Sequence, residues 1–394
     1  MALVDGHRIA LPGTLPGERV LASLEGERGT CLAVLSASAD RVAPICPHFG
    51  VCGGCAVQHW RAKSIGEWKR ARVQTALARA GLNIEVAPAR DAHGAGRRRV
   101  TLHVRRKDGA SVAGFMRARS HELIDLDTCP LLVSALAPAP DLARGIGHIL
   151  RGIEKPLDVQ FTAAIEGLDI DIRGAGRLDE GLRQKLVQFA MQHDLARLTL
   201  HGERLIEARV PSVLLEGTEM RAFIPPGSFL QPTGAGEALL AELAGEALKG
   251  AKNVAETFCG LGPFGLRFSR TMKVSAYDSE RGAIECFQRS IRANPGGKPI
   301  TAEARDLFRR PLFAPELKAF DAILLDPPRQ GAEAQMREVA KSKLSRIAYV
   351  SCDPESFARD AKLAVDAGFK LKSVTPVDQF RFSAHVELVA ELVR

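Results

Sequence analysis

Apolar and polar residues follow different patterns along the chain, and the change falls near residue 223. From there on, short apolar runs at residues 253–258, 274–278, 320–326 and 346–351 alternate with stretches long enough for helices. Such alternation predicts a mostly parallel β-sheet with helices on both faces. Ligands of these sheets bind beyond the carboxyl ends of the strands, so we expect the chemistry of residues 223–394 at those ends.

The residues before this point show other patterns. Residues 1–45 alternate in short runs broken by Pro-Gly and glycine-rich turns, which is typical of a small β-barrel. Residues 46–222 mix helical and strand periods and predict an α+β domain, with a helix over residues 61–80 and a hairpin turning at Asp108 and Gly109. The sequence therefore predicts three domains, at 1–45, 46–222 and 223–394.

The composition is that of a globular protein. Of 394 residues, 46% are apolar and 25% are charged, which excludes collagen-like, coiled-coil and wholly disordered chains. No apolar run reaches the roughly 18 residues of a membrane span. Residues 1–13 lack the basic start and apolar stretch of a signal peptide. We expect a cytoplasmic protein with no membrane partner.

The net charge of +8 comes from one segment. Residues 60–120 hold 15 Lys and Arg against 4 Asp and Glu, a local +11, whereas the rest of the chain holds 39 against 42, or −3. A concentrated basic segment indicates a polyanionic partner, although most single lysines and arginines in such a run are simply solvated.

Glycines and acidic residues follow the first two strands of the predicted sheet. The segment ETFCGLG (256–262) leads from a strand into a helix, and Asp278 ends the next strand. Glycines let the backbone approach a ligand closely, and an acidic residue at the second strand end can accept ribose hydroxyls. Because the three-glycine dinucleotide pattern is absent, this loop favours S-adenosylmethionine over NAD. An ordinary tight turn is the alternative.

Two further strands end in a proline-rich loop and in a cysteine. Asp326 begins DPPR (326–329), in which two prolines hold the carboxylate on a stiff loop unless the run is an ordinary strand exit. Arg329 stands where aminomethyltransferases carry an aromatic residue, which argues against that class. Cys352 in SCDP (351–354) is either a small core residue or a nucleophile above the cleft. Beside the other motifs, the nucleophile is favoured.

Eight cysteines in a cytoplasmic chain indicate ligands or nucleophiles rather than disulfides. Cys46, Cys52 and Cys55 are clustered, and Cys129 lies far along the chain beside a proline. Four thiolates can hold an iron–sulfur cluster or structural zinc. Zinc sites usually use two close pairs, so this spacing favours a 4Fe-4S cluster. Since Cys129 lies beyond the basic hairpin, such a cluster would tie down the basic segment.

Together these motifs resemble the RNA uracil-5-methyltransferase family, specifically its iron–sulfur-containing ribosomal RNA branch. The resemblance covers essentially the whole chain. It is carried by the cysteines with Gln58 and His59, by FLQ (229–231), ETFCGLG, DPPR and SCDP, and by HVE (385–387). It implies an N-terminal RNA-binding barrel of the OB or TRAM type, a cluster-bearing central domain and a class I methyltransferase domain.

The resemblance also implies roles for single residues. Cys352 is expected to be the nucleophile and Glu387 the base. Five positions match the S-adenosylmethionine site of the family: Gln231, Phe258, Asp278, Asp306 and Asp326. The expected cluster ligands are Cys46, Cys52, Cys55 and Cys129.

The chemistry of uracil explains why a thiol and a base belong together. Carbon 5 is a poor nucleophile, but thiolate addition at carbon 6 gives an enolate whose carbon 5 can attack a sulfonium methyl. A base must then remove the carbon 5 proton so that the thiolate can leave. Glu387 lies in a near-terminal segment expected to return to the same sheet; the residues alone equally fit a solvated strand position.

The sequence thus predicts a monomeric enzyme that methylates carbon 5 of a uridine in RNA, in 23S rRNA by preference, with the target base unpaired or flipped out. One alternative takes tRNA as substrate. Another is a non-catalytic iron–sulfur protein that binds RNA or senses redox state. The joint presence of Cys352, Glu387 and Asp326 weighs against the second alternative.

Overall fold

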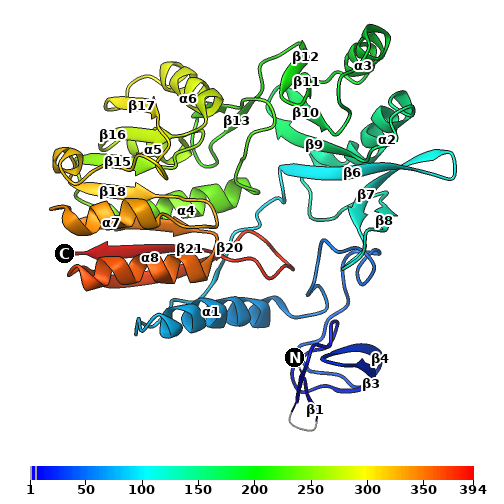
Figure 1. Cartoon of the computed structure of the whole chain (residues 1–394), viewed down its shortest axis with the longest axis horizontal. Coiled ribbons are helices and arrows are strands. Elements are labelled where there is room, and N and C mark those ends of the chain that lie inside the picture. The colour runs from blue at the N-terminus through cyan, green and yellow to red at the C-terminus, as the bar shows by residue number, and fades with distance from the viewer. Residues whose placement is uncertain (1, 5–6) are drawn as a thin grey trace.

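The computed structural model describes residues 2–4 and 7–394, and its largest element is an eight-stranded sheet (Figure 1). All strands except β21 run parallel to one another. In spatial order the strands are β17 (Ile300–Ala304), β16 (Lys273–Asp278), β15 (Asn253–Thr257), β18 (Ala322–Leu325), β19 (Arg346–Ser351), β21 (Glu387–Val393), β20 (Lys370–Asp378) and β5 (Arg90–Asp91). The predicted α/β sheet is confirmed.

Helices cover both faces of this sheet. One face packs on α4 (Gly234–Ala247), α5 (Pro263–Phe268) and α6 (Arg281–Ala293). The other packs on α1 (Ala62–Arg79), α7 (Glu333–Lys341) and α8 (Pro354–Asp366). Central strands such as β18, with the sequence AILL, are buried at every position because both faces are covered.

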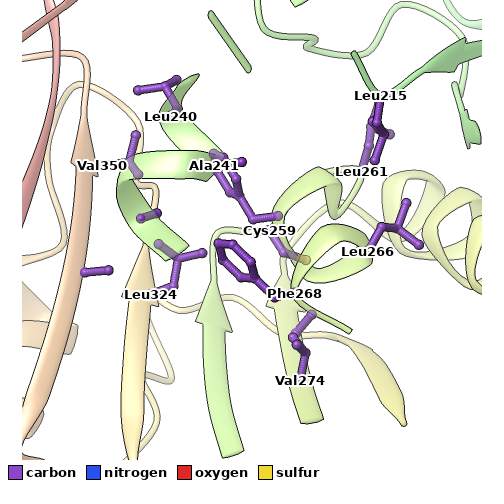
Figure 2. Close-up of a cluster of buried hydrophobic side chains, with 14 of the residues drawn as sticks. Leu215, Leu240, Ala241, Cys259, Leu261, Leu266, Phe268, Val274, Leu324 and Val350 are labelled. Atoms are coloured by element: carbon purple, nitrogen blue, oxygen red, sulfur yellow. The ribbon is translucent and has the colours of Figure 1, made fainter. Parts of the chain in front are cut away.

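The glycine-containing loop after β15 rests on the first of these two cores. Figure 2 shows Cys259 and Leu261 near Ala241 and Phe268, just beyond the arrowheads that mark the strand ends. Cys259 is only 5% exposed, which explains why this cysteine has no chemical role: it fills the core as a small apolar residue. This packing holds the loop against the hydrophobic core.

A second sheet forms the central part of the chain, with α2 (Ala139–Ile149) and α3 (Glu180–Gln192) packed against it. Its order is β12 (Glu203–Glu207), β11 (Arg197–Leu200), β10 (Gly167–Arg173), β9 (Leu157–Ala164), β6 (Arg99–Lys107), β7 (Ala110–Met116) and β8 (Leu123–Asp125). The predicted hairpin is confirmed, since Asp108 and Gly109 both have positive φ between β6 and β7.

The predicted N-terminal barrel is not confirmed by the described residues. Residues 2–4 and 7–45 form two separate antiparallel pairs, joined by one bridge from Ala10 to Arg28. The first pair is β1 (Ala2–Val4) with β2 (His7–Ile9), and the second is β3 (Arg19–Glu25) with β4 (Arg28–Ser36). Leu21 and Leu32 stay more than half exposed, because no further strand of this segment covers the second pair.

Helix α1 and strand β5 depart from the predicted boundary at residue 222. Both were expected in the central domain, yet α1 packs against α8 and β20, and β5 extends the eight-stranded sheet beside β20. The reason is the apolar stripe of α1, in which Val73 and Leu77 are fully buried. The helix ends before Gly81, whose φ of +75° allows the turn.

A small antiparallel pair completes the link between the two large sheets. It joins β13 (Ser212–Leu214) to β14 (Arg221–Phe223), and β14 packs on α6 of the C-terminal domain. Two single-turn 3₁₀ helices occupy Ser134–Leu136 and Glu316–Ala319. Among the helices that the structure describes, none has the length and apolar character needed to cross a membrane.

A buried ion pair fastens α1 to the sheet. Lys69, fully buried, donates to Asp378 at 2.5 Å and to the Phe380 carbonyl at 3.0 Å. Burial lowers the pKa of Lys69, and Asp378 opposes that shift. The pair holds the end of β20 at the point where the chain leaves for its last loop.

Replacing Lys69 by Ala should destabilise the protein by about 3–5 kcal/mol, because it leaves the Asp378 carboxylate buried without its partner. Urea unfolding followed by circular dichroism measures the change. Lys63→Ala, an exposed position on the same helix, is the matched control and should change stability by less than about 0.5 kcal/mol. Equal effects for the two variants would contradict the proposed role of the pair.

Candidate active site

The predicted site residues meet at the carboxyl edge of the eight-stranded sheet. Phe258 follows β15, Asp278 ends β16, Asp326 follows β18 and Cys352 follows β19. Glu387 comes from the opposite direction as the first residue of β21. Since β21 is antiparallel, its start lies at the edge where the parallel strands end.

Strand pairing places Cys352 and Glu387 side by side. Ser351 in β19 pairs with Leu388 in β21, so the next residues outward, Cys352 and Glu387, lie opposite each other. Glu387 is 4% exposed and pairs on its other side with Val377 of β20. The predicted thiol and the predicted carboxyl are therefore neighbours across two strands, although 34 residues of sequence separate them.

Burial and neighbouring carboxyls raise the pKa values of these groups. Burial, followed by the nearby Glu387 and Asp326 carboxyls, raises the pKa of Cys352 to about 12, while Arg329 opposes the shift. Burial and Asp326 raise the pKa of Glu387 to about 8, against Gln379 and Arg329. The pKa of Asp326 rises to about 7 for the same reason, with Asp278 as its charged neighbour. The site thus accommodates a cation or a proton donor better than an anion.

The glycine loop between β15 and α5 has an unusual backbone. Phe258, Gly260 and Gly262 all have positive φ, at +61°, +52° and +67°. A Cβ at Gly262 would lie 2.1 Å from the Phe287 ring, so only glycine fits there, whereas nothing lies within 4 Å of Gly260 on the open side. The left-handed Phe258 costs about 1–2 kcal/mol, which the packed loop must offset.

Asp278 accepts a hydrogen bond from this loop and can still accept further hydrogen bonds. One carboxylate oxygen accepts from the Gly260 N–H at 2.9 Å, and the other accepts from the Glu280 N–H at 2.9 Å. Each oxygen has a second lone pair, so a ribose hydroxyl can still donate to the same carboxylate. The sequence-based hypothesis for Asp278 therefore fits its place beside the loop.

Asp306 lies at the next strand end and holds an aromatic side chain in position. Its Oδ1 accepts from the N–H groups of Phe308 and Arg309, at 3.0 and 3.2 Å. The Phe308 ring stands 5.3 Å from the Phe258 ring in a tilted arrangement. Two predicted positions, Phe258 and Asp306, thus meet through Phe308, which the sequence analysis did not identify.

Gln231 reaches the site from the segment before α4. Its Oε1 accepts from Gln379 Nε2 at 2.7 Å, and its amide helps to lower the pKa of Asp326. The backbone carbonyl of Gln231 accepts from Arg98, which is itself paired with Glu237 at 2.6 Å in the interior. Gln379 also opposes the rise in the pKa of Glu387, and no sequence motif marked it, since its only signal is its place eight residues before Glu387.

Glu256, the first residue of the glycine segment, is buried without a hydrogen-bond partner on either oxygen among the described residues. A Cβ on Gly265 would lie 2.4 Å from its Oε2, so the carboxyl fits against the start of α5 only because that residue is glycine. Burial and the neighbouring Asp326 raise its pKa well above the usual range. The neutral acid belongs to the same acidic group as Asp326 and Asp278.

The four predicted cysteine ligands gather in one place outside the sheet. Burial raises the pKa of Cys55 to about 11, and the neighbouring Cys129, Cys52 and Cys46 add to this rise. Gln58 holds the group together, because its Oε1 accepts from the Cys46 N–H at 3.1 Å and its side chain also bonds to Cys55. Within residues 2–4 and 7–394, no three His, Cys, Asp or Glu side chains are drawn together tightly enough to hold a metal ion.

The cysteine segment touches the loop that leads to Glu387. Ala56 and Val57 donate backbone hydrogen bonds to the Phe382 carbonyl, at 2.7 and 3.2 Å. In Figure 1 this loop between β20 and β21 extends toward the N-terminal part of the chain. Arg97 lies over the Phe380 ring and interacts with Cys55 and Cys129. The basic segment, the cysteines and the final loop therefore form one connected surface.

Several proteins that are similar to this chain are named as RNA methyltransferases. Residues 300–394 match the family described as tRNA (Uracil-5-)-methyltransferase. The chain is 44% identical to an uncharacterized RNA methyltransferase of Caulobacter vibrioides, over 99% of this chain and 95% of that protein. It is 30% identical to the 23S rRNA (uracil(1939)-C(5))-methyltransferase RlmD of Chromohalobacter salexigens, over 99% of this chain and 85% of that protein.

A solved structure shares the fold. The crystal structure of Pyrococcus abyssi tRNA (uracil-54, C5)-methyltransferase in complex with S-adenosyl-L-homocysteine superposes with a TM-score of 0.75. The match covers 98% of this chain and 95% of that one at 23% sequence identity. The likeness therefore extends beyond the C-terminal sheet to nearly the full length of both chains.

Replacing Glu387 by Gln should raise the rate at which iodoacetamide alkylates Cys352 at pH 9, on the order of 3- to 10-fold. At that pH Glu387, with a pKa of about 8, is largely ionised and repels the thiolate; glutamine removes this charge. Mass spectrometry of the Cys352 peptide gives the rate at this one cysteine. At pH 6.5 the carboxyl is protonated, so the two rates should converge.

Glu391→Gln is the control for this experiment. Glu391 lies on the same strand but pairs with Arg346 at 2.8 Å, away from the cysteine. Its replacement should leave the alkylation rate of Cys352 unchanged. If Glu387→Gln behaved like this control at pH 9, the two groups would not be coupled as the structure indicates.

Proposed function

Because the chain belongs to the RNA uracil-5-methyltransferase family, we propose that it methylates carbon 5 of a uridine in 23S rRNA, with Cys352 as nucleophile and Glu387 as base. It is an S-adenosylmethionine-dependent RNA methyltransferase. The observation that carries the mechanism is the position of Cys352 opposite Glu387 at the edge of the sheet, beside the glycine loop.

The first step is addition of the Cys352 sulfur to carbon 6 of the uridine. The thiol loses its proton to water, the S–C6 bond forms, and the electrons of the C5–C6 double bond move to carbon 5 and the C4 oxygen as an enolate. With a pKa of about 12, the thiol is protonated at rest. Arg329, which lowers this pKa, is the nearby cation that favours the thiolate.

The second and third steps build and release the product. Bound S-adenosylmethionine supplies an electrophilic methyl group on a sulfonium. Carbon 5 takes this methyl as the bond from the methyl to the sulfonium sulfur breaks and leaves a neutral thioether, and Glu387 then accepts the carbon 5 proton. The electrons of the C5–H bond restore the double bond, and the S–C6 bond breaks to return the Cys352 sulfur. A carboxyl with a pKa of about 8 is a stronger base than an ordinary glutamate once it is ionised.

The residues of the site suit this methyl donor. Its sulfonium and ammonium groups are cations, and the buried Asp326, Glu256 and Glu387 carboxyls would each be stabilised in their ionised form by a neighbouring positive charge. Asp278 can accept a ribose hydroxyl, and the Phe258 and Phe308 rings offer apolar contact to an adenine. The open side of Gly260 leaves room for the ligand.

We favour 23S rRNA over tRNA as the substrate. The relative named as a 23S rRNA enzyme is 30% identical to this chain, whereas the solved tRNA enzyme is 23% identical. The second alternative, a non-catalytic RNA-binding or redox-sensing protein, has less support. Burying a thiol beside two carboxyls of raised pKa costs stability, and such costs occur where chemistry requires them.

We further propose that Cys46, Cys52, Cys55 and Cys129 hold a 4Fe-4S cluster. A 4Fe-4S cluster takes four cysteine thiolates as its ligands. The four thiols are neighbours, since Cys52, Cys55 and Cys129 each have a pKa raised by burial and then by other members of the group. The spacing along the sequence, three clustered cysteines and a distant fourth, favours the cluster over zinc. The cluster would brace the basic surface and the loop held at Phe382.

Glu387→Gln should lower turnover on the order of 10²- to 10⁴-fold, because loss of the base stalls the reaction after methyl transfer. A covalent adduct between Cys352 and the RNA should then accumulate, visible as a slowly migrating band on denaturing gels. The adduct should form with 23S rRNA transcripts and not with tRNA transcripts.

Two variants control this experiment. Cys352→Ser should form no adduct with any RNA, and Glu391→Gln should keep normal turnover. Undiminished turnover of Glu387→Gln would reject the assigned base. An adduct with tRNA alone would replace 23S rRNA by tRNA as the substrate.

Protein purified without oxygen should be brown, with broad visible absorption and equal amounts of iron and acid-labile sulfide. Cys129→Ser should lose the colour and bind RNA more weakly, since it removes one cluster ligand. Cys286→Ser, which lies outside the group of four, should keep both colour and affinity. Colourless protein loaded with zinc would reject the cluster.

A further inference from the structure

A groove of about 410 Å³ lies between α1 and the start of α8, outside the site described so far. One wall is a stripe on α1 formed by Trp68, Arg72, Thr75 and Arg79, spaced three to four residues apart. The other wall carries Asp353 and Glu355 at the beginning of α8. The opposite face of α1 is buried in the sheet core, so this stripe is the side of the helix that faces away from it.

The groove adjoins both proposed catalytic residues. Asp353 directly follows Cys352, and its carboxylate accepts from the Ser356 N–H at 2.8 Å to cap α8. Arg72 donates to the Ala384 carbonyl at 2.7 Å, three residues before Glu387. An RNA whose target base reaches Cys352 would therefore place its adjacent nucleotide over this groove.

The side chains of the α1 wall have the chemistry of a nucleotide site. The Trp68 ring is half-buried, with the Arg72 guanidinium 5.6 Å from its centre and the Trp60 ring 5.8 Å away. Arg72 is exposed and has no carboxylate partner among the residues that the structure describes. Proteins that bind single-stranded RNA combine such aromatic platforms for bases with cations for phosphates.

The charges on the opposite wall of the groove determine how a nucleotide would lie in it. Arg79 is neutralised by Glu355 at 3.0 Å, so Arg72 is the arginine of the stripe that remains available to a phosphate. The Asp353 and Glu355 carboxylates repel phosphate from the α8 side, but they can accept hydrogen bonds from an amino group of a base. The amino edge of the base therefore faces α8, while its ring stacks on the α1 wall and the phosphate lies at Arg72.

We propose that this groove binds the nucleotide adjacent to the target uridine, with its base stacked on Trp68 and its phosphate on Arg72. The inference rests on the proposed function in so far as the bound RNA presents a uridine to Cys352. It assigns an RNA contact to α1 of the catalytic domain, in addition to the basic hairpin of the central domain.

The test combines protein variants with altered RNA. Trp68→Ala should weaken binding of a short single-stranded RNA that contains one uridine roughly 5- to 150-fold, with KM rising by a similar factor and kcat nearly unchanged. An RNA that lacks the base next to the uridine should bind wild type and Trp68→Ala equally. Trp68→Phe should keep most of the affinity, because a phenyl ring still stacks.

Two further measurements test the same contact. Arg72→Ala should reduce the slope of log affinity against log salt by about 0.7, and Arg72→Lys should preserve it. The chain holds only two tryptophans, so in a Trp60→Phe variant the quenching of fluorescence by RNA reports on Trp68 alone. Arg337→Ala, an exposed helix position on α7, is the control for Arg72 and should leave affinity unchanged.

The outcomes separate this inference from the proposed function. If wild type methylates uridine but Trp68→Ala binds the intact RNA as tightly as wild type, the groove does not hold the neighbouring nucleotide. The same conclusion follows if the loss persists with the RNA that lacks the neighbouring base. If wild type shows no methylation, the proposed function fails, and fluorescence quenching still decides whether a base stacks on Trp68.

Discussion

The antiparallel strand β21, inserted between β19 and β20, is the constraint on which the rest of the site depends. The other seven strands of the sheet run parallel, and β21, which runs against them, begins at the edge where they end. Glu387 consequently starts in the cleft rather than at the far edge. Without this reversal, the thiol after β19 would have no carboxyl beside it.

The same insertion buries Glu387. It is held between two strands, with Glu256 buried and Asp326 partly buried at neighbouring strand ends. Charged carboxylates are costly in such surroundings, so their pKa values rise and the resting site is largely protonated. The cationic methyl donor and the RNA therefore enter a site whose carboxyls and thiol have raised pKa values. A bound cation would lower these pKa values and favour the ionised forms.

The connection between the N-terminal cysteines and the last loop makes the domains interdependent. The Phe382 carbonyl accepts from Ala56 and Val57, while Lys69 holds Asp378 and Phe380 from the side of α1. Both sets of contacts act on the end of β20 or on the eight residues between β20 and β21. Segments that are far apart along the chain thus fix the approach to Glu387, and α1 serves the catalytic sheet although it follows the cysteines in sequence.

Local patterns were enough to predict much of the protein. Apolar runs identified β15, β16, β18 and β19, the Asp-Gly pair identified the hairpin, and the motifs at strand ends identified the residues that meet in the site, because strand period and turn chemistry depend on neighbours in sequence. Tertiary contacts alone determined the pairing of β21, the packing of α1 on the eight-stranded sheet and the open form of the N-terminal strands. They also determined the positions of Gln379 and Phe308 in the site. These depend on which distant surfaces bury each other, and no local period encodes that choice.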